Sequence, residues 1–436
     1  MSRKKRFRKL EVPGWFTSPP DTAVDFDGKS YPARSGEPLT LTLLANGVRV
    51  LGRSAKYHRP RGLFCGRGTC GHCLAQVDGQ PNLRLCRCEA RRGERVESQN
   101  VMGSARFDLL ATIDWLFPGG LDHHHLMIES ATLNRMALAM AHELSGLGKL
   151  PPSPATRSEV LPNVRRVQVA VVGGGPAGRA AAEKTCAAGL DTIIIDREAL
   201  SGPGFLGSSQ VIGFYDDRYL VVVDAERHFW IEPQVIILAT GAVEQLPSVP
   251  GNDLPGVFAR RAAERALDCG VLPGRRRVVA ADREADASTR RRGQELTGRL
   301  LSCGAQVELT LGLGARTGAA NALDAELCEV EGRSRVKRVT LEGGIDAFDC
   351  DALIWCGRPV PAYELPRQLG LSTPYSATVG GFVPEHETDG RTERPELFVA
   401  GELAGVEADH AAAHGARVGN SVVAAIAVQP SAAEVS

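Results

Sequence analysis

In its N-terminal part the chain alternates apolar and polar positions in short runs, a pattern that predicts strands. From Ala23, AVDFDGKSYPAR reads as two strands joined at Asp27-Gly28, and LAQVDGQPNLRL reads as a hairpin that turns at Asp78-Gly79. Between them, GEPLTLTLLANG is predicted to be a helix that Gly47 stops. Strands around one helix with a cysteine-rich loop are typical of a small β-grasp (α+β) ferredoxin-like domain, which we place at residues 22–103.

Residues 104–165 carry a helical pattern followed by a proline-rich linker. Apolar positions from Leu133 to Leu144 repeat at helical spacing, and Gly146 is a suitable stop. PPSPATRSEVLP then predicts a linker. At the other end, residues 1–21 are basic, run into FTSPP and predict a disordered tail.

From Val167 the pattern changes to wholly apolar strands that alternate with glycine turns and helices. VQVAVV, GGGPAG, RAAAEKTCAAG and LDTIIID form a predicted βαβ unit, and QVIILATGA gives a second strand that ends in glycine. ELFVAGELAG precedes a helix of small residues from Asp409 to about Ala427. This α/β alternation predicts Rossmann-like nucleotide-binding domains. ILATGA at 237–242 and LFVAGELAG at 397–405 also resemble the later flavin motifs of two-dinucleotide-domain flavoproteins. That resemblance implies a discontinuous FAD-binding Rossmann-like domain, residues 166–255 and 366–430, and a second, NAD-like domain at residues 256–365.

Composition supports an ordinary globular chain. Its 436 residues suggest about three domains at roughly 150 residues each. Hydrophobic residues make up 43% and charged residues 23%, which excludes global disorder and collagen-like structure. Lys plus Arg and Asp plus Glu are both 51, so a broad nucleic-acid surface is not expected. No apolar run is long enough to span a bilayer, and the basic N-terminus lacks a secretory apolar stretch, so we expect a cytoplasmic protein.

Five of the eleven cysteines lie between residues 65 and 88. Crowding of this kind in a cytosolic protein indicates a metal or cluster site. The spacing Cys65-x4-Cys70-x2-Cys73-x12-Cys86 suits a 2Fe–2S cluster, which needs four thiolates, three of them from one tight loop. Glycines 66, 68 and 71 let that loop wind closely. A zinc site or plain buried thiols are the alternatives.

Two residues near the cluster motif leave open questions. Cys86 and Cys88 alternate in LRLCRC, so on a strand both would face the same side, and we prefer Cys86 because it closes the hairpin in better register. His72 lies inside the loop, but a Rieske-type role requires two histidines in place of two cysteines. We therefore expect His72 to be a solvent-edge or hydrogen-bonding residue.

The glycine turn that opens the first Rossmann-like unit predicts a bound dinucleotide. Gly173 permits the turn, Gly175 lets a pyrophosphate approach the backbone, and Gly178 lets helix pack on strand. Pro176 and Ala177 begin the helix whose N–H groups face the phosphates. Asp196 ends the second strand, where an acid would hold the ribose hydroxyls.

The cysteine-rich segment, YHRPRGLFCGRGTCGHCLAQVDGQPNLRLC, resembles the alpha-type subunits of heterotetrameric sarcosine oxidases, opine oxidases and hydrogen cyanide synthase. Sarcosine oxidase alpha subunits share HRPRG but generally lack the cysteines, so this chain is closer to the other two groups. The resemblance implies that a separate flavoprotein beta subunit oxidises the amine or amino acid. The separate resemblance to two-dinucleotide-domain flavoproteins implies flavin contacts at Thr240-Gly241 and at Gly401-Glu402, and in those flavoproteins the second pair is Gly-Asp. NAD in the same site is the alternative to FAD. Folate chemistry is not expected, because the chain ends just after the flavin-domain helix.

The second nucleotide domain departs from its expected pattern. After RRRVVAAD, where glycines are expected, the chain reads AADREADAST, and Asp282, Glu284 and Asp286 would repel a pyrophosphate. We predict a Rossmann-like domain that has lost nicotinamide binding.

Three further sequence features are candidates for a site. Asp122-His123-His124-His125 is more typical of a loop than of a metal site, since adjacent side chains point apart. His410 and His414 are placed to face the flavin or a partner. The arginine runs at 275–277 and 290–292 are read as solvated faces.

These features predict an electron-transfer subunit carrying a 2Fe–2S cluster and FAD, because the pairing divides a hydride equivalent into single electrons. No catalytic constellation for breaking a C–H bond is evident, so the catalytic residues are unassigned. The alternatives are a self-contained NAD(P)H-dependent reductase and an assembly subunit with a structural dinucleotide only.

Overall fold

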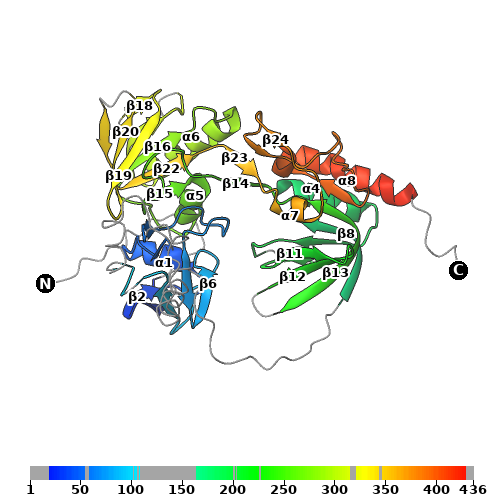
Figure 1. The fold of residues 1–436 in the computed structure, drawn as a ribbon, viewed down its shortest axis with the longest axis horizontal. Helices are drawn as coiled ribbons and strands as arrows, with labels where there is room; N and C mark the ends of the chain where they lie inside the picture. The colour runs from blue at the N-terminus through cyan, green and yellow to red at the C-terminus, as the bar shows by residue number, and fades with distance from the viewer. Residues whose placement is uncertain are drawn as a thin grey trace, which may run out of the picture. The chain divides into compact units, whose positions relative to one another are not determined.

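A computed structural model describes residues 19–54, 58–101, 103–105, 108, 164–199, 202, 204–224, 227–314, 321–342 and 346–428. The chain divides into two compact units, Met1–Ala155 with Leu246–Gly357 and Thr156–Gln245 with Arg358–Ser436 (Figure 1). The predicted connector helix and the 122–125 histidine stretch lie outside the described residues. Within the described ranges, no helix has the length and apolar character needed to cross a membrane.

The first unit begins with the ferredoxin module, residues 19–101. Its five-stranded sheet has the order β2-β1-β7-β5-β6, and both predicted hairpins and the predicted helix are confirmed. Asp27 and Gly28, and likewise Asp78 and Gly79, have positive φ, as tight hairpin turns require. The elements are β1 Thr22–Phe26, β2 Lys29–Ala33, α1 Leu39–Ala45, β3 Gly52–Arg53, β4 Pro60–Arg61, β5 Leu74–Val77, β6 Gln80–Arg84 and β7 Arg95–Ser98.

The same unit contains the second nucleotide-type domain, residues 246–357. Its five-stranded parallel sheet has the order β15-β22-β16-β17-β18, and β19-β20-β21 form a separate antiparallel sheet. The elements are β15 Val257–Ala259, α5 Arg260–Asp268, β16 Arg276–Ala281, α6 Ala287–Ser302, β17 Gln306–Leu311, β18 Asn321–Leu323, β19 Leu327–Gly332, β20 Val336–Leu341, β21 Ala347–Asp349 and β22 Ala352–Cys356.

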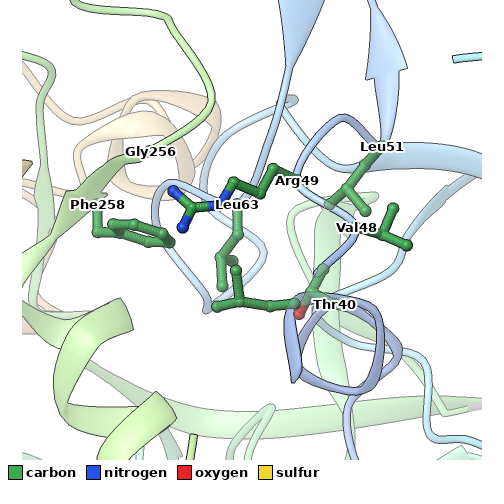
Figure 2. A pocket seen from close by; sticks show the side chains of 8 residues that line it. Thr40, Val48, Arg49, Leu51, Leu63, Gly256 and Phe258 are labelled. Carbon is green, nitrogen blue, oxygen red and sulfur yellow. The ribbon is translucent and has the colours of Figure 1, made fainter. Parts of the chain in front are cut away.

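The ferredoxin module and the second nucleotide-type domain share apolar cores. Phe258 and Ala266 belong to the cluster that contains Leu39 and Leu63 of the module. Figure 2 shows Phe258 beside Leu63 and Arg49 around a small cavity of about 10 Å³. A space of that size holds about one water molecule at most, so the contact is packed and is not a ligand site.

Arg277 corrects one prediction for this domain. The reading of the run 275–277 as a solvated face is wrong for Arg277, which is 2% exposed. Its guanidinium donates to the backbone oxygens of Gly274, Arg275 and Gln306. Burial lowers the pKa of Arg277 to about 10. The side chain therefore links the backbone just before β16 to the first residue of β17.

The second unit is built on a seven-stranded sheet of order β10-β9-β8-β13-β12-β11, with β26 paired to β13. β8, β9, β13 and β26 run parallel, and α4 packs against α8 (Figure 1). The predicted βαβ unit is confirmed. The elements are β8 Val164–Val172, α4 Pro176–Ala187, β9 Thr192–Ile195, β10 Phe205–Leu206, β11 Gln210–Tyr215, β12 Tyr219–Val223, β13 His228–Leu238, β14 Ala242–Glu244, β23 Pro359–Pro361, α7 Glu364–Gln368, β24 Tyr375–Ser376, β25 Gly381–Phe382, β26 Leu397–Val399, the 3-10 turn η2 Gly401–Ala404 and α8 Ala411–Val428.

Candidate cluster and dinucleotide sites

The four predicted ligands lie together around the cysteine loop, residues 64–73, and the turn that follows β6. Cys65, Cys73 and Cys86 are 1–2% exposed and Cys70 is half-buried. The Sγ atoms of Cys70 and Cys65 are 3.2 Å apart. Two hydrogen bonds lower the pKa of Cys65. The one with the Cys70 thiol has the larger effect, and the one with the Cys86 thiol comes second. Hydrogen bonds with the Cys65 thiol, first, and then with the Cys73 thiol raise the pKa of Cys86. The thiols of the cysteine loop and the thiol of the turn therefore lie in contact with one another.

The backbone of the loop also suits thiolate ligands. The N–H groups of Arg67 and Cys70 donate to Cys65 Sγ at 3.5 and 3.4 Å. Gly66 and Gly68 have positive φ, which lets these N–H groups point inward. Such donors stabilise negative charge on a ligand sulfur. The donor set and its N–H bonds thus fit a 2Fe–2S cluster.

The choice between Cys86 and Cys88 has a structural basis that differs from the one predicted. β6 ends at Arg84, so the assumption that both residues continue the strand is wrong. Cys86 contacts Cys65 and Cys73, whereas the Cys88 thiol donates to Arg84 O at 3.6 Å. Burial raises the pKa of Cys88 to about 11. The turn therefore directs Cys86 to the other thiols.

His72 and the zinc alternative can be judged from the same geometry. The His72 ring lies 5.7 Å from the Phe64 ring, and burial, followed by the charge of Arg61, lowers its pKa to about 4. Among the described side chains, no three histidines, cysteines or carboxylates are arranged to hold a single ion. A 2Fe–2S cluster takes its thiolates in pairs, two on each iron. The four thiols supply the number of ligands that such a cluster requires.

The first glycine turn has the shape that a pyrophosphate requires. A Cβ at Gly173 would lie 2.1 Å from Ala239 O, and one at Gly178 would lie 1.9 Å from Gly173 O. A Cβ at Gly175 would meet nothing within 4 Å. Gly173 and Gly178 are therefore needed for packing, and Gly175 leaves open space at the N-terminus of α4, which begins with Pro176 and Ala177.

Asp196 follows β9, as predicted, and it also organises the turn. Its Oδ2 accepts from the N–H of Gly174, and its Oδ1 accepts from the N–H of Glu198 at 2.7 Å. Each carboxylate oxygen has a second lone pair, so contact with a ribose hydroxyl remains open to this side chain.

The two later glycine motifs lie near each other in the second unit. Gly241 has φ +72°, and a Cβ there would lie 3.8 Å from Glu402 Oε2. The Thr240 hydroxyl donates to Ala362 O at 3.3 Å. Gly401, with φ +71°, packs so closely on Ala177 that a Cβ would lie 2.6 Å from its methyl group. The structure thus brings the predicted residues Gly241 and Glu402 beside the α4 turn.

His414 holds this arrangement in place, a role that the sequence did not predict. Its Nδ1 accepts the N–H of Gly401 at 3.0 Å, and the side chain is 2% exposed. Burial, then the charges of Arg417 and His386, lowers its pKa. The only sequence signal was one polar residue on the small-residue face of α8, where Gly415 and Gly419 approach the α4 backbone.

The N-terminus of α6, where a second dinucleotide would bind, is capped by the chain itself. Asp286 Oδ1 accepts the N–H of Thr289 at 2.6 Å. Arg290 donates to the backbone oxygens of Ala285, Arg283 and Gly312. A carboxylate therefore takes the place that an anionic phosphate uses at such a helix end.

Comparison with known proteins identifies the N-terminal domain and gives relatives of the chain. The family of 2Fe-2S iron-sulfur cluster binding domains matches residues 21–101. The sarcosine oxidase alpha subunit of Rhizobium meliloti is 26% identical over 419 residues, 82% of this chain and 42% of that relative. Hydrogen cyanide synthase subunit HcnA of Pseudomonas aeruginosa is 38% identical over 88 residues, 20% of this chain and 80% of that subunit. The chain therefore spans less than half of the first relative.

A solved structure confirms the predicted fold class. The L-proline dehydrogenase from P. horikoshii superposes with a TM-score of 0.68 at 20% identity, over 98% of this chain and 76% of that one. The chain therefore has a 2Fe–2S cluster-binding domain and a flavoprotein-type dinucleotide-binding fold.

Proposed function

The chain belongs to the family that includes sarcosine oxidase alpha subunits and hydrogen cyanide synthase subunit HcnA, and on that premise we propose that it is an electron-transfer subunit of an amine- or amino-acid-oxidising complex. It is an oxidoreductase of that family with a 2Fe–2S domain. The substrate would be a secondary amine or amino acid of the sarcosine, opine or proline kind. A separate flavoprotein subunit would oxidise it.

The observation that carries the proposal is the capped helix end of the second nucleotide-type domain. Asp286 and Arg290 satisfy the α6 N-terminus and its neighbouring carbonyls, where a nicotinamide dinucleotide would otherwise bind. A self-contained reductase needs that site to receive hydride from NADH or NADPH. With the site closed, electrons would come from a partner subunit.

We assign the cofactors to the residues already described. Cys65, Cys70, Cys73 and Cys86 would ligate the cluster. FAD would lie with its pyrophosphate on the α4 turn, held by the dinucleotide residues Gly173, Gly175, Pro176, Ala177, Gly178, Asp196, Thr240, Gly241, Gly401 and Glu402. When bound, the flavin supplies two-electron chemistry and the cluster one-electron chemistry.

The chain's own residues bind, orient and shield these groups. The α4 N-terminus offers N–H groups and the positive end of its dipole to the pyrophosphate. The Glu402 carboxylate lies beside Gly241, within reach of a ribityl chain that passes this turn. His414 fixes the Gly401 peptide and leaves its own Nδ1 without a proton. Around the cluster, burial of three cysteines excludes water.

An anaerobic absorption titration tests the proposal. The purified chain, with cluster and flavin reconstituted, is titrated with NADH and with NADPH, and then with dithionite. We expect dithionite to bleach both centres and neither nicotinamide to do so within seconds. Rapid bleaching by either one would show that the chain accepts hydride itself, which would refute the electron-transfer subunit. Co-purification with an amine-oxidising flavoprotein then identifies the partner.

A further inference from the structure

The second nucleotide-type domain forms one wall of the cluster site. Cys65 and Phe64 lie in the same apolar core as Val257 and Ala259 of that domain. The N–H of Ala259, at the N-cap of α5, donates to Phe64 O at 3.0 Å. A Cβ at Gly66 would lie 3.1 Å from Ala262, so α5 packs directly against the loop. The residues on both sides of Cys65 are thus fixed by a domain whose own dinucleotide turn is missing.

Arg265 makes a polar contact with the same loop. Its Nη1 donates to Gly66 O at 2.6 Å. The peptide that carries this oxygen also carries the N–H of Arg67, and that N–H donates to Cys65 Sγ at 3.5 Å. The guanidinium, one peptide group and the sulfur therefore form a continuous chain of hydrogen bonds. In such a chain each bond polarises the next, and the effect grows where water is excluded.

We propose that the second nucleotide-type domain serves the cluster, and that Arg265 is a positioning residue that raises the cluster's reduction potential. Reduction adds one negative charge to the cluster and its thiolates. A fixed positive charge on the far side of the Gly66–Arg67 peptide stabilises that charge, both directly and by strengthening the N–H bond to Cys65. Hydrogen bonds to ligand sulfurs, net charge and solvent exposure are the known determinants of such potentials. The inference rests on the proposed ligation by Cys65.

The test is an EPR-monitored redox titration of the reconstituted full-length chain, comparing wild type with Arg265→Gln. We expect the ratio of reduced to oxidised cluster at a fixed solution potential to fall at least threefold, a shift of about 28 mV at 59 mV per tenfold change. Arg265→Lys keeps the charge but not the planar donor, and we expect an intermediate value. Arg338→Gln removes the same charge from an exposed arginine paired with Asp349 on a neighbouring strand, and it should leave the ratio unchanged.

EPR observes only the reduced form of assembled clusters, and each signal is normalised to that of the same sample fully reduced by dithionite, so partial loading does not affect the comparison. A wild-type ratio in loaded Arg265→Gln overturns the proposal, as does an equal shift in Arg338→Gln. If Arg265→Gln assembles no cluster, Arg265→Met, which also removes the charge, takes its place: a ratio lowered at least threefold supports the proposal, and a wild-type ratio overturns it. Dithionite is the reductant throughout, so the outcome is independent of nicotinamide, flavin and partner. If the reconstituted wild-type chain gives no EPR signal after reduction, the proposed ligation of the cluster by Cys65 is refuted instead.

Discussion

At the scale of single residues, the fourth cluster ligand can be tested directly. Cys86→Ser should lose most of the iron and the visible absorbance after anaerobic reconstitution, because Cys86 is the thiol that joins the turn to Cys65 and Cys73. Cys88→Ser is the matched control, two positions away, and should keep both. Iron and sulfide content per chain measures the result. Full loading of Cys86→Ser with loss in Cys88→Ser would reverse the assignment.

His414 gives a pH dependence with a definite sign. Its folded pKa lies below the unfolded value of 6.5, so the unfolded chain takes up a proton first as the pH falls. The stability that neutral His414 contributes is present above pH 6.5 and is lost as the pH falls through the folded pKa. The slope in that window is at most about 1.4 kcal/mol per pH unit.

The measurement is denaturant unfolding of the second unit, followed by hydrogen exchange at several pH values below and above 6.5. His414→Asn offers Gly401 an amide oxygen that does not titrate, so this part of the slope should disappear. His410→Asn changes an exposed histidine four positions earlier and should leave the slope as it is. An unchanged slope in His414→Asn would assign the pH dependence to other groups.

At the scale of secondary-structure elements, the glycine turn before α4 contains one glycine that is needed for dinucleotide binding and another that is needed for packing. Gly175 has φ −73°, which alanine adopts freely, and a Cβ there meets no atom. Gly175→Ala should therefore fold normally and lose the dinucleotide, because its methyl group enters the space reserved for the pyrophosphate. Gly178→Ala should instead destabilise the second unit by about 1–3 kcal/mol through overpacking against Gly173 O.

Bound flavin per chain and the midpoint of thermal unfolding distinguish the two effects. Gly298→Ala on α6 is the control: a Cβ there also meets nothing, so the flavin content should not change and the midpoint should not fall, since alanine favours a helix interior. Normal flavin content in Gly175→Ala would show that the pyrophosphate lies elsewhere.

The sequence predicted those elements whose signals are local. The two Asp-Gly hairpins, the Gly47 stop and the βαβ unit each depend on residues within one segment, and all were found. The predictions failed where a residue's conformation or burial depends on a contact with another segment of the chain. LRLCRC ends as a turn because β6 has strand partners only to Arg84. Arg277 is buried because carbonyls from Gly274 and Gln306 converge on it. His414 acts through Gly401, thirteen positions away in the chain.

At the scale of the whole molecule, the first unit joins two segments that the sequence treats as separate domains. Its composition gave no reason to pair the ferredoxin module with residues 246–357, because the apolar residues that do so, such as Leu63 and Phe258, are ordinary core residues in either segment. Their association also gives the second nucleotide-type domain, which lacks a glycine turn, a structural role beside the cysteine loop. The Arg265 contact with the cysteine loop depends on it.

Two ion pairs strengthen the association between the ferredoxin module and the second nucleotide-type domain. Arg49 of the module donates to Asp351 Oδ2 at 2.8 Å, and Arg61 pairs with Asp253. Burial tends to raise the pKa of Asp351, but the N–H groups of Arg275 and Arg276 and the charge of Arg49 outweigh it and lower the pKa. The pair therefore stabilises the unit above pH 3.8, the ordinary value for aspartate, and loses its effect as the pH falls through the folded pKa.

We expect the module and the second nucleotide-type domain to unfold in one transition. In a double-mutant cycle of Arg49→Met and Asp351→Asn at neutral pH, the coupling energy should be roughly 1 kcal/mol, since both side chains are partly buried and the asparagine still accepts the Arg275 and Arg276 N–H groups. The cycle Arg338→Met with Asp349→Asn, an exposed pair within the second domain, should give less. Each variant should lower the stability of both segments together when hydrogen exchange follows them separately. Loss of protection in the module alone would mean that it folds on its own and that α5 merely touches the cysteine loop.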